Sequence, residues 1–166
     1  MTLLVTAVAI ILISFGFVVL RGAPYVPSHR KQLRQAFGEL YKIGKQDVVV
    51  DLGSGDGAVI AMANEYGAKA LGYEINPLLW IMTTLRFWGN NNARVELRDY
   101  QSLSRLEQEV TVVYAFTTSH SIEGIGRKLE QWSANQELYF ISYGFTLKSH
   151  KPIRSVGPMY LYRFSK

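Results

Sequence analysis

Hydrophobic positions divide the chain into a long uncharged beginning and a series of short apolar runs. Residues 2–20 contain no charged side chain. From residue 45 onward, short apolar runs rich in β-branched residues alternate with stretches whose apolar residues recur every three or four positions. The first kind of run predicts a buried strand and the second an amphipathic helix. Strands that alternate with helices predict an α/β fold with a doubly wound, Rossmann-like parallel sheet.

Glycines and prolines between these runs place the elements along the chain. The predicted strands cover residues 48–52, 71–74, 94–97, 110–116, 138–143, 153–155 and 159–164. The predicted helices cover residues 31–42, 58–66, 77–88 and 122–132. Since the fourth strand is apolar throughout, we expect it to be buried on both faces. The last two strands, joined around Gly157 and Pro158, predict a C-terminal antiparallel hairpin.

The uncharged run of residues 2–20 is nineteen residues long. As an α-helix it would span about 28 Å, close to the hydrocarbon thickness of a bilayer. A cleaved signal peptide is one alternative, but no basic residue precedes the run and residues 21–24 make a poor cleavage site. A buried core helix is another, but it would normally show a polar stripe. We therefore predict a retained, single-pass transmembrane anchor over residues 1–20.

The net charge of +5 is concentrated directly after this predicted anchor. Residues 21–45 contain six basic side chains and one acidic side chain, which leaves the rest of the chain formally neutral. The positive-inside rule then places the domain on the cytoplasmic (or matrix) side of the membrane. The basic segment can also hold the domain against anionic headgroups; the alternative is a solvated helix face without a lipid role. Nucleic acid is not an expected partner, because the basic residues lie where the membrane should be.

A glycine-rich turn follows the first predicted strand. Asp51 lies at the end of that strand, and Gly53, Gly55 and Gly57 follow at alternate positions. Such glycines bring the backbone close to a polar ligand. A second acid, Glu74, ends the next strand twenty-three residues after Asp51. Both acids are expected at the carboxyl ends of adjacent strands, where ligands bind in α/β sheets. An acid in this place can accept hydrogen bonds from both hydroxyls of a ribose.

Three interpretations of this turn differ in chemistry. Dinucleotide-binding proteins use Gly-x-Gly-x-x-Gly and place a pyrophosphate at a bare helix N-terminus. This chain has Asp-Leu-Gly-x-Gly-x-Gly, which resembles motif I of the class I S-adenosylmethionine (SAM) methyltransferases. SAM carries an ammonium and a sulfonium, so an acid beside the turn, Asp51, favours it over a phosphate. An ordinary glycine turn in a parallel sheet is the third interpretation.

A third acid, Asp99, follows the third predicted strand and precedes Tyr100. A lone Asp-Tyr pair after a strand is usually only a turn. The resemblance to class I methyltransferases implies more: an acid here accepts a hydrogen bond from the adenine amino group of SAM. Tyr100 would pack on the adenine ring.

The resemblance extends over nearly the whole chain. The motifs that carry it are residues 22–27 (Gly-Ala-Pro-Tyr-Val-Pro), 51–57, 72–77, 98–100, 113–116, 128–129 and 141–145. Together with the predicted anchor they resemble the small membrane-anchored protein-lysine methyltransferases. The mitochondrial members of that family modify the adenine nucleotide translocase and the c subunit of ATP synthase. The glycine motif is generic to class I enzymes, whereas the anchor and the Pro-Tyr-Val-Pro segment are specific.

The resemblance implies roles for individual residues. Asp51 and the three glycines of the turn would hold the methionine part of SAM, and Glu74 its ribose. Pro24, Tyr25 and Pro27 would cover the site and shape the substrate entrance, and Tyr114 would line the methyl-transfer channel.

Tyr25 and Tyr143 are further candidates for that channel; ordinary packing is the alternative for each of the three tyrosines. The sequence departs from the family at residues 115–117 and 133–136. Both departures lie near the acceptor side, so they bear on the substrate rather than on SAM.

These inferences predict a SAM-dependent methyltransferase that modifies lysine on a membrane protein. We expect an anchor over 1–20, a basic segment over 21–45 and a SAM-binding domain over 46–166. The alternatives are a methyltransferase for a lipid or quinone-like small molecule, and a SAM-binding domain without catalysis. The chain has no cysteine, which excludes disulfides and a thiol nucleophile. Its three histidines lack metal-ligand spacing, so no metal is expected.

Overall fold

The computed structural model describes residues 2, 5, 6, 9, 29–107, 109–116 and 118–165. Most of the predicted anchor, residues 1–20, lies outside this set, and so do Pro24, Tyr25 and Pro27. Within the described residues, no helix has the length and apolar character needed to cross a membrane.

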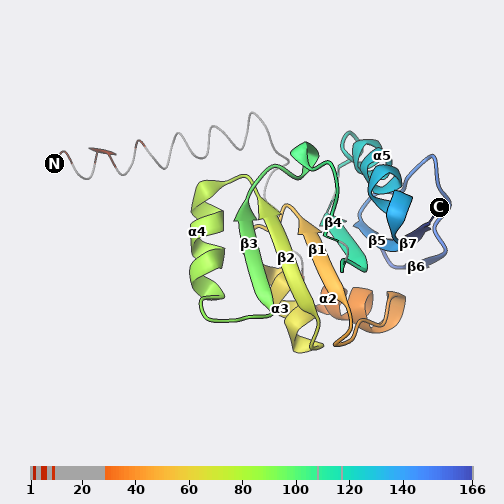
Figure 1. Cartoon of the computed structure of the whole chain (residues 1–166), viewed down its shortest axis with the longest axis horizontal. Helices are drawn as coiled ribbons and strands as arrows, with labels where there is room; N and C mark the ends of the chain where they lie inside the picture. Colours follow the sequence, from red (N-terminus) through yellow and green to blue (C-terminus); the bar gives the residue numbers. More distant parts are fainter. Residues whose placement is uncertain are drawn as a thin grey trace.

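A seven-stranded sheet in the order β3-β2-β1-β4-β5-β7-β6 forms the centre of the molecule (Figure 1). The strands are β1 (Val48–Leu52), β2 (Lys69–Glu74), β3 (Ala93–Leu97), β4 (Val112–Phe116), β5 (Leu138–Tyr143), β6 (Arg154–Val156) and β7 (Met159–Phe164). The pairings among β1 to β5 are all parallel, as predicted. The C-terminal hairpin is also confirmed, because β7 pairs antiparallel with both β5 and β6.

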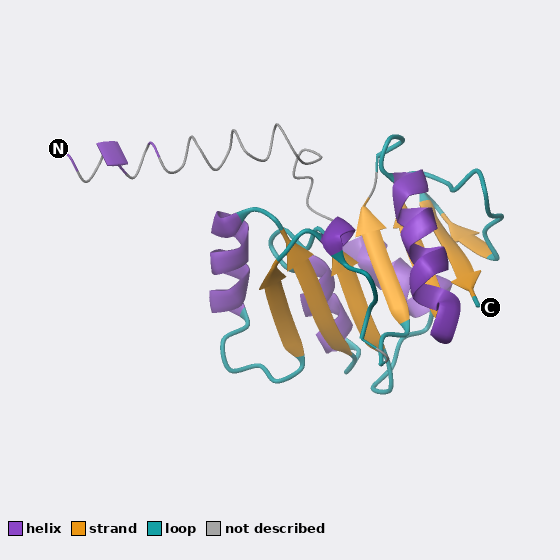
Figure 2. Cartoon of the chain, turned by 45° about the horizontal axis from the view of Figure 1, so that its top comes forward, coloured by secondary structure: helices purple, strands orange, loops and turns teal. Residues whose placement is uncertain are grey.

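Helices cover both faces of the sheet (Figure 2). They are α2 (Arg30–Gln35), α3 (Ala58–Glu65), α4 (Pro77–Arg86) and α5 (Ile122–Trp132), with short turns η1 (Ala36–Leu40), η2 (Tyr100–Ser102) and η3 (Ser133–Asn135). The predicted helix over 31–42 is thus an α-helix that continues as a π-turn, in which the Tyr41 N–H donates to the Ala36 carbonyl over 2.9 Å. Such a turn places one extra residue in the helix, which a 3.6-residue pattern does not predict.

Two hydrophobic clusters, one on each face, form the core. The first joins α5 to the sheet through residues such as Ile125, Leu129 and Trp132. The second joins α2, η1 and α3 to the opposite face and includes Leu33 and Phe37, which are fully buried. The C-terminal part of the basic segment 21–45 therefore packs into the core. β4 is buried over four of its five residues, as its apolar sequence predicted.

Gly72 lies in β2 beside the glycine turn. The neighbouring residues leave no room for a side chain at this position. A Cβ there would come 2.5 Å from Ser54 Cβ and 2.8 Å from Ile60 Cδ1. We expect Gly72→Ala to destabilise the protein by about 1–3 kcal/mol through overpacking, measured by denaturant unfolding. Gly124 in α5 is the matched control, since a Cβ at that position would have its nearest neighbour 3.9 Å away. Gly124→Ala should stabilise the protein by about 0.5–1 kcal/mol through helix propensity; equal effects of the two changes would contradict this prediction.

Candidate functional site

The strand order reverses between β1 and β4, at the carboxyl edge of the sheet. β1 leads to β2 and β3 on one side, and the chain then crosses over to β4 on the other. In open α/β sheets this switch point is where ligands bind. Asp51 lies there: it is opposite Gly72 on one neighbouring strand and opposite Tyr114 on the other.

The glycine turn bends sharply after β1. Gly53, Gly55 and Gly57 have φ angles of 92°, 52° and 77°, in the left-handed region that favours glycine. The N–H groups of Gly53 and Ser54 both donate to the Tyr73 carbonyl, over 2.9 and 3.0 Å. At Gly57 a Cβ would meet Phe87 at 2.6 Å. The turn is therefore fixed against β2 and α4, with its backbone at the switch point.

Glu74 connects the glycine turn to the turn after β2. One carboxylate oxygen accepts the Gly55 N–H over 2.8 Å, and the other accepts the Asn76 N–H over 2.7 Å. The side chain is 6% exposed. Each carboxylate oxygen has two acceptor positions, so two backbone bonds leave capacity for ribose hydroxyls. Sequence reasoning placed Glu74 at the right edge but missed these two bonds.

Asp51 is buried at the centre of the site, with 4% of its surface exposed. Its burial, followed by the negative charges of Glu74 and Asp56, raises the pKa of this carboxyl well above its usual value. All three causes disfavour the ionised form. A cation bound beside Asp51 would offset them by stabilising the carboxylate. This electrostatic environment suits an ammonium or sulfonium group and opposes a phosphate.

Asp99 and Tyr100 follow β3 at the same edge. Asp99 is exposed, and one of its carboxylate oxygens accepts the Gln101 N–H over 2.8 Å, which starts η2. Tyr100 is half-buried against the cluster that includes Leu103, and this burial is the main cause that raises the pKa of its hydroxyl. The second carboxylate oxygen of Asp99 is the candidate acceptor for an adenine amino group.

Aromatic residues gather at the carboxyl ends of β4 and β5, beside Asp51. Residues two apart on a strand share a face, so Phe116 follows Tyr114 on the side that α2 and η1 cover. Tyr114 is 1% exposed and packs edge-on against Phe37, with ring centroids 6.1 Å apart. Phe116 and Tyr143 are half-buried and form a T-shaped pair with centroids 4.6 Å apart. Sequence reasoning missed the contact between Phe116 and Tyr143, because only the strand register places the two residues opposite each other.

Helix α4 holds the glycine turn from outside. The Thr83 hydroxyl donates to the Gly55 carbonyl over 2.7 Å, and the Arg86 guanidinium donates to the Asp56 carbonyl over 2.7 Å. Thr83 is also the one residue of α4 that is fully buried. Sequence reasoning missed both contacts, because they join residues about thirty positions apart.

We expect Thr83→Val, which keeps the shape of the side chain, to destabilise the protein by about 1–3 kcal/mol. The substitution leaves the buried Gly55 carbonyl without its hydroxyl donor. The neighbouring Thr84 provides a matched control, because its hydroxyl is buried and makes no hydrogen bond within the described structure. Thr84→Val should be neutral or stabilising. Thermal unfolding of both variants tests the prediction, and equal losses would contradict it.

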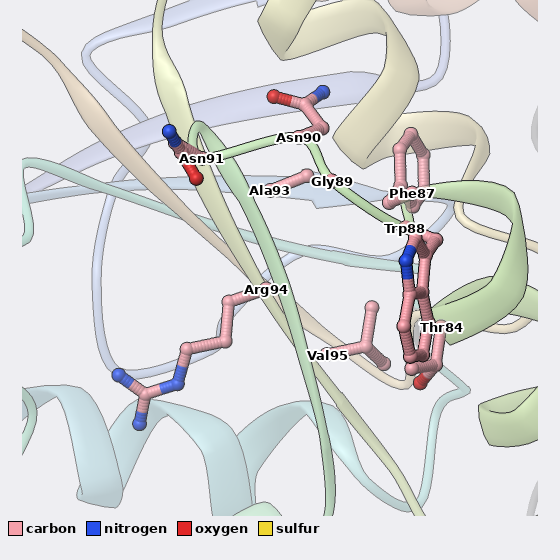
Figure 3. Close-up of a pocket in the computed structure, with 9 residues that line it drawn as sticks. All are labelled: Thr84, Phe87, Trp88, Gly89, Asn90, Asn91, Ala93, Arg94 and Val95. Atoms are coloured by element: carbon pink, nitrogen blue, oxygen red, sulfur yellow. The ribbon is translucent and has the colours of Figure 1, made fainter.

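A surface pocket of about 300 Å³ lies away from this site, at the start of β3 and the end of α4 (Figure 3). Phe87 and Trp88 form one wall, and Arg94 points away from their rings. None of the predicted cofactor residues lines it.

Comparison with known proteins gives relatives of named activity. Over 65 residues the chain is 38% identical to the lysine N-methyltransferase of the ATP synthase c-subunit from Xenopus laevis. Over 66 residues it is 38% identical to the adenine nucleotide translocase lysine N-methyltransferase of Mus musculus. Each match covers 39% of this chain and 28% of the relative. The chain thus matches less than a third of the length of these relatives.

Among solved structures, an RNA methyltransferase from Salinibacter ruber in complex with S-adenosyl-L-homocysteine has a similar fold. The TM-score is 0.72 at 25% identity, over 84% of this chain and 92% of that one. The seven-stranded sheet is therefore a Rossmann-like methyltransferase fold, as predicted.

The family model described as the ANTKMT methyltransferase domain matches residues 51–154. This stretch begins at Asp51 and contains the predicted cofactor residues together with Tyr114 and Tyr143. Because the match covers more than half of the chain, this protein belongs to the ANTKMT methyltransferase domain family.

Proposed function

We propose that this chain is a SAM-dependent protein-lysine N-methyltransferase that acts on a membrane protein. The observation that carries the proposal is the buried Asp51 carboxyl, which begins the family match and lies against the glycine turn at the switch point. The names of the two relatives, which methylate lysine on the ATP synthase c subunit and on the adenine nucleotide translocase, support the acceptor class.

The residues of the site fit SAM part by part. Asp51 would accept the ammonium of the methionine part, and the exposed backbone of Gly53, where a Cβ has no neighbour within 4 Å, leaves room for it. Glu74 would accept the ribose hydroxyls and Asp99 the adenine amino group. When bound, SAM supplies a methyl group activated by its sulfonium. The protein contributes mainly by holding that group in line with the acceptor.

A lysine acceptor must lose its proton before it can attack. Aromatic walls at Tyr114, Phe116 and Tyr143 would strip water from the ammonium and lower the pKa of the lysine. The proton then passes to water. Tyr25 is proposed as a further wall, with Pro24 and Pro27 at the entrance. Together these four aromatic side chains would shape a channel for an unbranched alkyl amine.

The membrane part of the proposal rests on sequence. Residues 1–20 would form a single transmembrane helix, and the basic residues of 21–45 would keep the domain on the cytoplasmic (or matrix) side. An acceptor lysine on an integral membrane protein would then lie close to the site.

Labelling with tritiated SAM tests the proposal. Full-length protein is incubated with membranes from a strain that lacks it, and the label is separated into protein, lipid and RNA fractions. Protein label that hydrolyses to methyl-lysine, and that is absent with Asp51→Asn, supports the proposal. Label in lipid would favour a lipid or quinone-like acceptor. Label in RNA, or no label while SAM still binds, would reject the lysine assignment.

A further inference from the structure

The outer face of α4 exposes a row of large apolar side chains. Ile81, Met82, Leu85 and Trp88 are 46%, 62%, 63% and 81% exposed. Positions 81 and 82 lie four and three residues before position 85, so these three side chains share one face of α4 and form a stripe, and Trp88 follows two residues after the helix ends. Soluble proteins rarely leave such a stripe uncovered unless another surface contacts it. The stripe lies at the β3 edge of the sheet, where α4 is the outermost helix (Figure 1).

The charge around this stripe is suited to a lipid surface. Residues 75–93 contain one charged side chain, Arg86, and no acid. Arg94 follows at the start of β3 and pairs with Glu96 and Glu107. The guanidinium of Arg86 donates to the Asp56 carbonyl, so an anionic headgroup layer would meet apolar side chains at the stripe and no carboxylate from residues 75–93. Tryptophan at one end of an apolar helix face is typical of proteins that lie in the membrane interface.

The segment between the predicted anchor and the domain is short enough to keep the domain near the lipid. Under the proposed function, residues 1–20 lie in the bilayer, and eight residues, 21–28, separate them from His29. Fully extended, eight residues reach about 28 Å. The domain would thus stay within one domain diameter of the lipid, at a high effective concentration.

We propose that the outer face of α4 contacts the lipid bilayer, with Ile81, Met82, Leu85 and Trp88 in the headgroup and upper acyl region. This inference rests on the anchor of the proposed function. It adds a fixed orientation: the inner side of the same helix holds the glycine turn through Thr83 and Arg86. Lipid contact by α4 would therefore set how the cofactor site faces the membrane and any acceptor within it.

Tryptophan quenching tests this contact in the full-length protein. The three tryptophans are Trp80, Trp88 and Trp132, and the predicted anchor contains none. Trp132 is 3% exposed, and Trp80 is half-buried with its indole N–H on the Val95 carbonyl. The protein is reconstituted in vesicles of phosphatidylcholine and phosphatidylglycerol, with and without bromine on the acyl chains. Brominated lipid should quench the emission, and Trp88→Phe should remove most of that quenching.

A matched pair of charge substitutions separates the α4 face from other exposed apolar positions. Leu85→Glu introduces a carboxylate into the stripe, whereas Ile153→Glu does so at a residue that is 58% exposed beside β6, at the opposite edge of the sheet. Leu85→Glu should reduce the quenching to the level of Trp88→Phe, and Ile153→Glu should leave it unchanged.

The proposal fails if wild-type emission is unquenched, if Trp88→Phe retains the quenching, or if both glutamate variants behave alike. A dimer in which Trp88 is buried and unquenched would assign the face to a second copy and also overturn it. SAM binding is measured separately by calorimetry in detergent. Quenching without SAM binding would reject the proposed function and leave the lipid contact standing. SAM binding without quenching would reject the lipid contact and leave the proposed function standing.

Discussion

Asp51→Asn is expected to abolish measurable SAM binding and, at the same time, to stabilise the protein without ligand. The substitution keeps the size of the side chain but removes a charge that burial, Glu74 and Asp56 all disfavour. A positively charged ligand loses its buried counter-charge, which is among the larger single losses that a site can suffer. The unliganded protein loses an electrostatic penalty, and each kcal/mol recovered raises Tm by about 2–4 °C in a domain of this size.

The pH dependence of stability separates this effect from a general change in packing. The pKa of Asp51 is higher in the folded than in the unfolded protein, so the folded state binds more protons between the two values. The contribution of Asp51 to stability is fully present below the unfolded pKa, about 3.9, and is lost as pH rises through the raised folded pKa. Wild-type Tm should therefore decline over that window relative to Asp51→Asn.

SAM binding should show the opposite trend, because the ligand requires the carboxylate. Affinity should rise with pH over the same window, and calorimetry in buffers of different ionisation enthalpy should detect proton release on binding.

Asp99→Asn is the control for the stability measurements, since this acid is exposed and asparagine keeps the oxygen that accepts the Gln101 N–H. It should change stability by no more than about 0.5 kcal/mol. Equal Tm curves for wild type and Asp51→Asn would contradict the electrostatic account.

The sheet and its edge could be predicted from sequence because local signals specify them. The β-branched run before Asp51 and the acid at Glu74 each mark the end of a strand. Two parallel strands joined by a helix must present those ends at one edge, and the structure confirms that they are neighbours. The glycine turn was predictable for a similar reason, since its positive φ angles are a backbone requirement that the residue type itself reveals.

The supporting contacts could not be predicted, because they depend on three-dimensional packing. The Glu74 carboxylate bonds a residue nineteen positions earlier, and Thr83 bonds one twenty-eight positions earlier. The spacing of hydrophobic residues in the sequence does not indicate such pairs. The same holds for Phe116 and Tyr143, which meet through strand register. Sequence reasoning therefore identified the acids but assigned Glu74 a ligand role alone, whereas the structure adds a structural one.

This double role defines the second large expected effect, that of Glu74→Ala. SAM affinity should fall by roughly tenfold to a hundredfold, because a desolvated ribose loses an acceptor worth about 1.5–3 kcal/mol. Stability should also fall, since the buried N–H groups of Gly55 and Asn76 lose their partner, at about 1–3 kcal/mol each. Calorimetry and thermal unfolding of the same preparation measure both effects.

Two further variants separate the roles of Glu74. Glu74→Gln keeps one carbonyl acceptor and replaces the other oxygen with a donor, so it should lie between wild type and Glu74→Ala in both measurements. Glu65→Ala removes an exposed acid that pairs with Arg30 and Arg34; such pairs contribute at most about 1 kcal/mol, and SAM affinity should not change. If Glu74→Ala lowered Tm but the folded protein bound SAM as wild type does, Glu74 would only support the turn, and the ribose would have to bind elsewhere along this edge.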